Sequence, residues 1–442
     1  MLNQTDYLLK KSKNAAAIAP QEMRTAIVVG VVRDSRKREE LDEHLDELVL
    51  LADTAGFKVL QRVIQERKAI DPATYIGSGK VEEIATMVAA LEADAVIFDD
   101  ELSPAQGRNL EAAIEKPVTD RTGIILDIFA QRARTKEAKT QVELARLQYL
   151  LPRLTGMWSH FTRQRGGGVN MKGEGESQIE LDRRMTKNRI AELRRDLEEI
   201  GKQAEHRRKG RTEAYKVSLV GYTNAGKSTL MNALTEAGVL AEDRLFATLD
   251  AAMRALTLPS DDKVLLTDTV GFIRKLPPNL VASFRSTLDE INDADLLLHV
   301  VDSSHRVFED QILATNEILA ELGAGEKPVL MVFNKVDRLD GTGQRDRLAH
   351  LYPDSVAIAA KTGEGLEHLL TVVQRRFEAD RRELHLRLTP AQHRAVALLH
   401  QRARILDTQY DDEGNTLMRV MISPKDLGQL QAEAGHVIES LT

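Results

Sequence analysis

"KVSLVGYTNAGKSTL", residues 216–230, is the most informative stretch of this chain for its fold. The apolar run KVSLV is followed by GYTNAGKS (221–228), which fits the pattern G-x-x-x-x-G-K-[ST]. In such a loop the glycines let backbone N–H groups turn toward phosphate oxygens, and the following helix directs its positive N-terminal end at the same anion. A strand-to-helix turn that matches by chance is the alternative, but the motif is flanked by a strand and a helix as the chemistry requires. The stretch therefore predicts a phosphate-binding loop at the end of a buried parallel strand.

Three further short motifs each follow an apolar run: DTVG (268–271), NKVD (334–337) and AAKTG (359–363). The carboxyl ends of parallel strands meet at one edge of a doubly wound sheet, so these motifs should converge on one ligand. A carboxylate at Asp337 would accept two hydrogen bonds from a guanine edge, and adenine lacks that pair of donors. The order of the motifs therefore predicts a guanine nucleotide site.

Each part of the nucleotide has candidate partners in these motifs. Lys227 would neutralise the β and γ phosphates, and the hydroxyls of Ser228 and Thr248 would bind Mg²⁺, with Asp268 behind them. A threonine at a strand or helix edge is the alternative for Thr248, in LFATLD (245–250). The predicted catalytic residues are Lys227, Thr248 and Gly271. The predicted nucleotide-binding residues are Gly221, Tyr222, Thr223, Asn224, Ala225, Gly226, Lys227, Ser228, Thr229, Phe246, Asp268, Thr269, Val270, Gly271, Asn334, Lys335, Asp337, Ala359, Ala360 and Lys361.

Residues 213–378 resemble a GTPase domain of the Ras-like class. Such domains usually carry a glutamine directly after the DxxG glycine, where it orients the attacking water. Here that position is Phe272, and a phenyl ring cannot orient water by hydrogen bonding. We therefore expect a GTPase that is slow by itself and whose site is completed by a partner or another residue.

Composition and periodicity divide the chain of 442 residues into zones. The net charge of −7 excludes a uniformly basic coat, the absence of cysteine fits the cytoplasm, and no apolar run of about 18 residues would span a membrane. The sequence predicts an α/β multidomain protein with a flexible leader (1–23), an N-terminal α/β domain (24–133), an antiparallel helical hairpin (134–212), a Ras-like doubly wound P-loop GTPase domain (213–378) and a small C-terminal α+β domain of βαββα order (382–442).

The hairpin is predicted from two apolar stripes in 3-4-3 spacing, which is typical of coiled-coil seams. These are Leu144, Leu147, Leu151 and Leu154, then Ile190, Leu193, Leu197 and Ile200. Pairing between two chains, giving a dimer, is the alternative, although we expect a monomer. The glycine-rich stretch RQRGGGVNMKGEGES (163–177) lies between the stripes and is expected at the tip of the hairpin.

RNA contact is predicted around that tip, because residues 144–173 contain no acid. Cations meet phosphates and flat rings stack on splayed bases in RNA recognition. Trp158 could instead pack the base of the hairpin. The interval carries Arg146, Arg153, Arg163, Arg165, Lys172, Tyr149, Trp158, His160 and Phe161, and the candidates for RNA contact are Arg163, Arg165, Lys172 and Trp158.

Two other motifs leave alternatives open. RRKGR (207–211) is either a solvated linker or an RNA-backbone contact. YIGSGK (75–80) is interpreted as a strand-to-helix turn, with a second nucleotide contact as the alternative.

Four stretches resemble the HflX family of bacterial-type GTPases: YIGSGKVEEI (75–84), QVELARLQYLLPRL (141–154), GGGVNMKGEGESQIELDRR (166–184) and LFATLD (245–250). The chain departs from the family pattern at Glu174, at Ser177 and at AAMR (251–254). The resemblance implies a GTP-hydrolysing, Mg²⁺-dependent factor that binds the large ribosomal subunit and its rRNA and separates stalled or vacant ribosomes. It also implies that the hairpin enters near the peptidyl-transferase centre. A GTPase switch acting on another RNA or protein is the alternative, and NKVD argues against a P-loop kinase.

Overall fold

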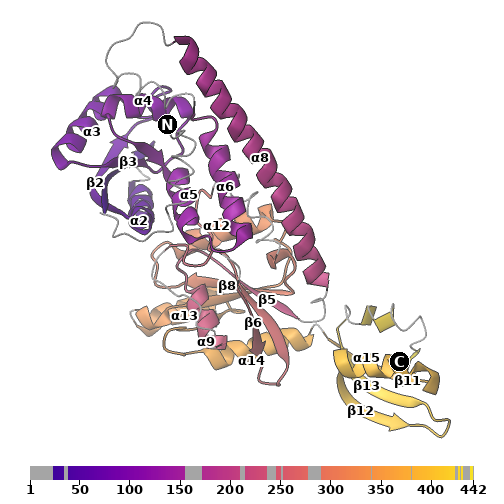
Figure 1. The fold of residues 1–442 in the computed structure, drawn as a ribbon. Coiled ribbons are helices and arrows are strands. Elements are labelled where there is room, and N and C mark those ends of the chain that lie inside the picture. The colour runs from indigo at the N-terminus through magenta and orange to yellow at the C-terminus, as the bar shows by residue number, and fades with distance from the viewer. Residues whose placement is uncertain are drawn as a thin grey trace.

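The computed structural model of the chain contains three β-sheets, and a long helix runs beside the first two (Figure 1). Figure 1 shows the N-terminal domain stacked on the GTPase domain and the C-terminal domain set apart. None of the described helices is both long and apolar enough to cross a membrane. The residues that the structure describes are 23–33, 38–154, 172–209, 215–235, 245–249, 252–276, 290–339, 341–379, 381–423, 427–428, 430–431 and 439–441.

The N-terminal domain is built on a parallel sheet with the order β2-β1-β3-β4. Two separate apolar clusters cover its faces, one under α2 and α5 and the other under α3 and α4. A capping box fixes the start of α4, where Ser103 and Gln106 bond reciprocally and Pro104 occupies the first turn. The elements are β1 (Arg24–Val32), α2 (Arg38–Thr54), β2 (Phe57–Glu66), α3 (Ser78–Leu91), β3 (Ala95–Phe98), α4 (Pro104–Ile114), β4 (Val118–Asp120) and α5 (Arg121–Arg132).

YIGSGK forms the turn that leads into α3. The Gly77 N–H donates to Gln65 Oε1, and Lys80 forms an ion pair with Glu83 one turn further along the helix. The Gly77 N–H and the Lys80 ammonium, which could have contacted a phosphate, thus have partners inside the domain. This supports the interpretation of YIGSGK as a strand-to-helix turn.

The hairpin consists of α6 (Lys136–Leu150) and α8 (Lys172–Lys209). Its leucine stripes pack on each other within one chain: Leu144, Ile190 and Leu193 are buried, with Leu147, Leu151 and Leu197 around them. The surface that the dimer alternative requires is therefore covered. The opposite face of α6 packs into the core of the N-terminal domain through Ala138, Val142 and Ala145, so α6 serves both units.

The GTPase domain has a six-stranded sheet with the order β10-β9-β8-β5-β7-β6, in which only β6 is antiparallel to its neighbour among the described strands. The doubly wound parallel sheet predicted from the near-continuous apolar runs is confirmed. Its elements are β5 (Lys216–Val220), α9 (Lys227–Thr235), β6 (Ala252–Thr257), β7 (Lys263–Asp268), β8 (Leu296–Asp302), α12 (Phe308–Glu321), β9 (Val329–Asn334), η3 (Val336–Arg338), α13 (Thr342–Leu351), β10 (Val356–Ala357) and α14 (Leu366–Ala379).

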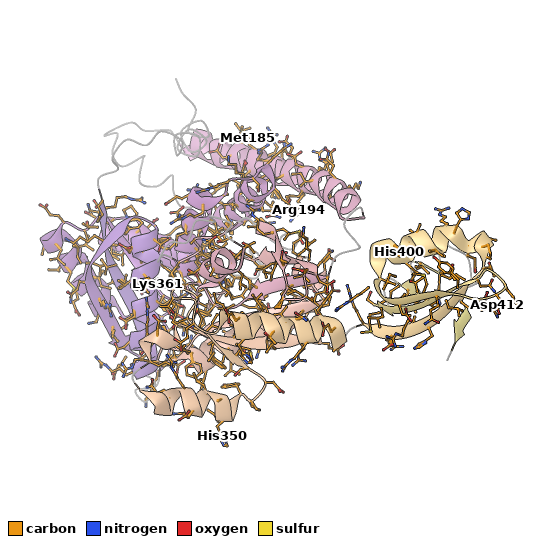
Figure 2. All side chains as sticks on the ribbon, turned by 90° about the horizontal axis from the view of Figure 1, so that it is seen from below. Met185, Arg194, His350, Lys361, His400 and Asp412 are labelled. Atoms are coloured by element: carbon orange, nitrogen blue, oxygen red, sulfur yellow. The ribbon has the colours of Figure 1, made fainter. Side chains whose placement is uncertain are left out.

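The C-terminal domain is a small antiparallel sheet with the order β12-β13-β11-β14, and Figure 2 marks it with His400 and Asp412. The predicted Thr389 cap forms a capping box with Gln392, with Pro390 between them. β14, which the expected βαββα order did not include, pairs with β11. The elements are β11 (Arg382–Leu388), η4 (Pro390–Gln392), α15 (His393–Arg402), β12 (Arg404–Tyr410), β13 (Thr416–Ile422) and β14 (Glu439–Leu441).

Candidate nucleotide-binding site

The loop between β5 and α9 needs its two glycines for space as well as for backbone conformation. Gly221 has φ +141° and Gly226 has φ +97°, values that side chains disfavour. A Cβ on Gly221 would lie 2.2 Å from the Val300 carbonyl oxygen, and one on Gly226 would lie 2.2 Å from Asn334 Nδ2. The loop is therefore folded tightly onto the neighbouring strands β8 and β9.

Lys227 opens α9 and is almost entirely buried, with 6% of its surface exposed. Its Nζ donates to the carbonyl oxygens of Gly221 at 3.0 Å and Tyr222 at 2.8 Å. Burial lowers the pKa of Lys227 to about 8, and the Asp268 carboxylate opposes that shift. The ammonium group is thus held inside the loop by neutral oxygens, where an anionic ligand would stabilise its charged form.

A cluster of three oxygen-bearing side chains lies beside the lysine. Ser228 Oγ is 2.7 Å from Thr248 Oγ1 and 2.7 Å from Asp268 Oδ2. Burial raises the pKa of Asp268 although Lys227 opposes the shift, and its Oδ1 is buried without a hydrogen-bond partner among the described atoms. Two hydroxyls and a carboxylate with a free oxygen form a donor set that suits a hard cation such as Mg²⁺. Thr248 lies in this cluster and in no described strand or helix.

Hydrogen bonds of the backbone and of the Thr223 hydroxyl join the phosphate loop to the segments that carry DTVG and Thr248. Thr223 donates its N–H to the Phe272 carbonyl at 2.7 Å, and Phe272 donates to the Gly221 carbonyl at 3.1 Å. Thr223 Oγ1 accepts from the Phe246 N–H at 2.9 Å. Gly271 is so close that a Cβ there would lie 3.1 Å from Lys227 Nζ. The three segments thus surround one pocket, whose lining includes Thr229 and Thr269.

NKVD and AAKTG are tied to the same loop from the other side. Asn334 Nδ2 donates to the Ala225 carbonyl at 2.9 Å, and its Oδ1 accepts from the Ala360 N–H at 3.0 Å. Lys335 Nζ donates to the Asn224 carbonyl at 2.9 Å and pairs with Asp302 at 2.7 Å. The motif at the end of β9 therefore also holds the shape of the phosphate loop.

Asp337 and Lys361 remain exposed at this edge of the sheet. Within the described part of the chain, the Asp337 carboxylate has no hydrogen-bond donor. The neighbouring Val336 is fixed, because its N–H donates to the Ile358 carbonyl at 3.2 Å and its carbonyl accepts from Arg345. A rigid loop thus presents a free carboxylate at the rim of the site, as the predicted contact with guanine requires.

Phe272, in the position of the usual glutamine, does not face the pocket. It is 1% exposed and belongs to an apolar cluster shared by the N-terminal and GTPase domains. In the same cluster, Phe246 meets Phe129 of α5 edge to face, with 4.7 Å between ring centroids. The segments on both sides of the pocket are therefore anchored in the interface between the two domains.

A buried polar network, which the sequence did not reveal, continues that interface. Arg121 is 2% exposed and pairs with Asp99 at 2.8 Å and with Glu47. Glu47 also accepts from the hydroxyl of Tyr222 in the phosphate loop, and that hydroxyl accepts from the Arg274 N–H at 2.8 Å. The network thus connects α2, α5 and β3 to the phosphate loop and to the residues after DTVG.

Lys275 completes the network, with Nζ 2.9 Å from Asp99 and 2.6 Å from Asp100. Burial opposes ionisation of Asp99, but the charges of Arg121 and Lys275 outweigh it and lower the pKa of that carboxyl. No spacing rule could have found these partners, since Tyr222 and Glu47 are 175 residues apart.

Two cations of the acid-free stretch have acidic partners in the N-terminal domain. Arg153 pairs with Asp120 at 3.2 Å and stacks over the Tyr149 ring at 3.7 Å, while Arg146 is 3.4 Å from Asp127. The acid-free stretch therefore has carboxylate neighbours that lie far from it in the sequence. The four candidates for RNA contact, Trp158, Arg163, Arg165 and the side chain of Lys172, lie outside the described residues. So do the leader to residue 22, the part of the glycine-rich stretch before α8 and residues 210–211 of RRKGR.

A phosphate loop, a cluster of two hydroxyls and a carboxylate beside it, and an exposed carboxylate after β9 lie at one edge of a mostly parallel sheet, as in a P-loop GTPase. Three family models match the chain: "GTP-binding GTPase N-terminal" over residues 42–130, "GTP-binding GTPase Middle Region" over 132–211 and "50S ribosome-binding GTPase" over 216–335.

Known proteins place this GTPase more narrowly. The GTPase HflX of Magnetococcus marinus is 45% identical over 412 residues, which cover 92% of this chain and 94% of the relative. That of Escherichia coli (strain K12) is 44% identical over 402 residues, covering 90% and 94%. The solved structure of a GTP-binding protein from Sulfolobus solfataricus in complex with GDP is 28% identical, with a TM-score of 0.43 and coverage of 80% of this chain and 98% of that one. The chain belongs to the HflX family of GTPases and hydrolyses GTP.

Proposed function

We propose that this GTPase binds the large ribosomal subunit and its rRNA and uses GTP to promote dissociation of stalled or vacant ribosomes. One observation carries the proposal: Phe272, which stands where such GTPases usually have the water-orienting glutamine, is buried in an apolar cluster shared by two domains. A GTPase built in this way hydrolyses slowly until a partner completes the site. The family model over residues 216–335 is described as a 50S ribosome-binding GTPase, which favours the large subunit as that partner.

Within the site, each residue has a proposed task. Backbone N–H groups of residues 221–229, together with Lys227, would hold the phosphates, and Thr248 and Gly271 would contact the γ-phosphate side. Asp337, with Asn334 behind it and residues 359–361 beside it, would bind the guanine. The buried ammonium of Lys227 and the orphaned Asp268 oxygen support this arrangement, because both are polar groups that a Mg²⁺–nucleotide complex would satisfy.

Mg²⁺ would be held by Ser228 and Thr248 with Asp268 behind them, and it would neutralise charge on the phosphate oxygens. The protein's own contribution is to position these hydroxyls, since Ser228 begins α9 and Thr248 is drawn in beside it at 2.7 Å. Residues 251–254, where the sequence differs from the HflX family pattern, come after Thr248 and are not among the three residues of the Ser228–Thr248–Asp268 cluster.

We also propose that the protein acts as a cytoplasmic monomer. The hairpin supports a monomer, because its leucine seam is closed within one chain. The absence of cysteine fits a reducing compartment.

The test is GTP turnover by the purified protein alone and with isolated large subunits. The expected result is a slow basal rate that the large subunits raise at least about tenfold, since external completion of such sites produces large effects. Small subunits serve as the control. An unchanged rate would overturn the partner-triggered mechanism.

Dissociation needs a separate measurement. Intact vacant ribosomes are incubated with the protein and GTP, then sedimented through a gradient. Free subunits should appear with GTP, and fewer with GDP. Stimulated hydrolysis without subunit release would point instead to a GTPase switch that acts on the ribosome or another RNA in some other way.

A further inference from the structure

The guanine side of the site is formed by two separate loops. Asp337 follows β9, and the backbone N–H groups of residues 360 and 361 follow β10. β10 has only two residues, which pair with two residues of β9. Because a strand this short gives few ladder hydrogen bonds, contacts beyond the sheet contribute to the spacing between the two loops.

One side chain joins the two loops. Arg345, on α13, donates from Nη2 to the Val336 carbonyl at 2.9 Å. Its Nη1 donates to Glu364 Oε1 at 2.5 Å, and Nη2 lies 3.5 Å from the second carboxylate oxygen. The planar fork of a guanidinium lets one side chain hold a carbonyl and a carboxylate in a fixed geometry. Arg345 thus links the residue before Asp337 to the residue after AAKTG.

Both partners of Arg345 lie next to the predicted guanine contacts. Val336 directly precedes Asp337 and is 1% exposed, so the packing of one residue fixes the backbone of the other. Glu364 ends the second loop, where its carbonyl accepts from the Ala359 N–H at 2.9 Å. A shift of either partner would therefore move one set of guanine contacts relative to the other. Such contacts weaken steeply when their geometry is lost.

The exposure of the ion pair separates a role in binding from a role in stability. The side chains of Arg345 and Glu364 are 40% and 47% exposed. Water screens a pair of this kind, and such pairs contribute little to the stability of a folded domain. Loss of the pair should therefore leave the domain folded and change mainly the geometry of the two loops.

We propose that Arg345 is a positioning residue for guanine, because it holds the Asp337 carboxylate at the spacing from residues 360 and 361 that the base requires. Figure 2 marks both elements, with His350 on α13 and Lys361 in the loop after β10. Arg345 acts through these groups. This inference rests on the guanine contacts of the proposed function, and it adds a determinant of base preference that lies outside the sequence motifs.

The test compares Arg345→Gln with a matched substitution on the same helix. Arg347→Gln is the control, because the Arg347 side chain is 74% exposed and lies 3.9 Å from Glu309 of α12. Arg345→Lys keeps the charge but not the planar fork, so it should show the same effect to a smaller extent. It replaces Arg345→Gln if that variant does not fold, as judged from the melting temperature. Asp337→Asn is measured beside them.

The full chain is titrated with GDP and with IDP in the presence of Mg²⁺. Inosine keeps the N1–H of guanine but lacks its exocyclic amine, so it can donate only one of the two hydrogen bonds expected at Asp337. Arg345→Gln should lower the affinity for GDP roughly tenfold, the loss expected when one of two charge-assisted hydrogen bonds is broken. The affinity for IDP should fall less, so the preference for GDP over IDP decreases. Arg347→Gln should bind both nucleotides as the wild type does.

The outcomes separate this inference from the proposed function. If Asp337→Asn loses affinity for GDP but Arg345→Gln binds it as tightly as Arg347→Gln does, the positioning role is overturned and the guanine contacts stand. Equal losses of affinity for GDP and IDP in Arg345→Gln would also overturn the role, because a general loosening of the site affects both nucleotides alike. If Asp337→Asn leaves the affinity for GDP unchanged, the guanine contacts themselves are wrong and this inference fails with them.

Discussion

Replacing Arg121 with methionine should destabilise the protein far more than replacing an exposed arginine of the same domain. The guanidinium lies between the carboxylates of Asp99 and Glu47, and both Arg121 and Asp99 have nearly no exposed surface. Removing one partner of a buried pair leaves an uncompensated charge, which costs about 3–5 kcal/mol. Lys275 still faces Asp99 at 2.9 Å in the variant, so we expect a value near the lower limit, about 3 kcal/mol.

The melting temperature is measured by differential scanning calorimetry. Tryptophan fluorescence is not used, because the single tryptophan lies outside the N-terminal domain. A loss of about 3 kcal/mol corresponds to a melting temperature lower by roughly 10–15 °C, because a domain of about 110 residues (24–133) unfolds with an entropy of about 2.1 cal/mol/K per residue. The matched control is Arg62→Met, since Arg62 pairs with Asp46 at the surface, with side chains 45% and 58% exposed. Such a pair contributes less than about 1 kcal/mol.

The pH dependence has a defined sign. The pKa of Asp99 is held below its ordinary value of 3.8 in the folded protein. The ionised Asp99 carboxylate therefore stabilises the folded protein above about pH 4, and this stabilisation is lost as the pH falls through the lowered pKa. The stability difference between wild type and Arg121→Met should be largest near neutral pH and should shrink below about pH 4. The reasoning would be refuted if Arg121→Met lowered the free energy of unfolding no more than Arg62→Met does. It would also be refuted if the loss caused by Arg121→Met were the same in acid as at neutral pH.

Three other substitutions test the nucleotide site. Asp337→Asn should shift preference from guanine toward xanthine nucleotides, with a GTP affinity loss of roughly 100-fold in a titration, and a retained affinity would exclude the assigned role. Phe272→Gln should not restore rapid hydrolysis, because the side chain is buried away from the pocket, and burying an unpaired amide there should cost about 1–3 kcal/mol. A faster basal GTPase rate would contradict that placement. Ser228→Ala should raise the Mg²⁺ concentration needed for half-maximal GTPase activity at least about tenfold. The control is Ser218→Ala, in the same domain. An equal Mg²⁺ requirement in both variants would argue against Ser228 as a Mg²⁺ ligand.

Features that depend on residues close together along the chain could be predicted from the sequence. The phosphate loop was readable because the glycines, Lys227 and Ser228 act within one turn between a strand and a helix. The hairpin was readable because a stripe with the period of a helix identifies the buried face, and Leu193 meets Leu144 as the two stripes indicate. Thr248 was found through a short motif, and the structure draws it to Ser228 at 2.7 Å.

Contacts between groups far apart in the sequence became known only from the tertiary structure. Arg121 and Glu47 are 74 residues apart, and Lys275 is 176 residues from Asp99, so no periodicity connects them. For the same reason the acid-free stretch gave no sign that Arg153 forms an ion pair with Asp120, 33 residues earlier. Burial of Phe272 depends on the N-terminal domain packing against the GTPase domain. Composition sets neither this docking nor the pairing of buried charges, because both arise only when separate folded surfaces come into contact.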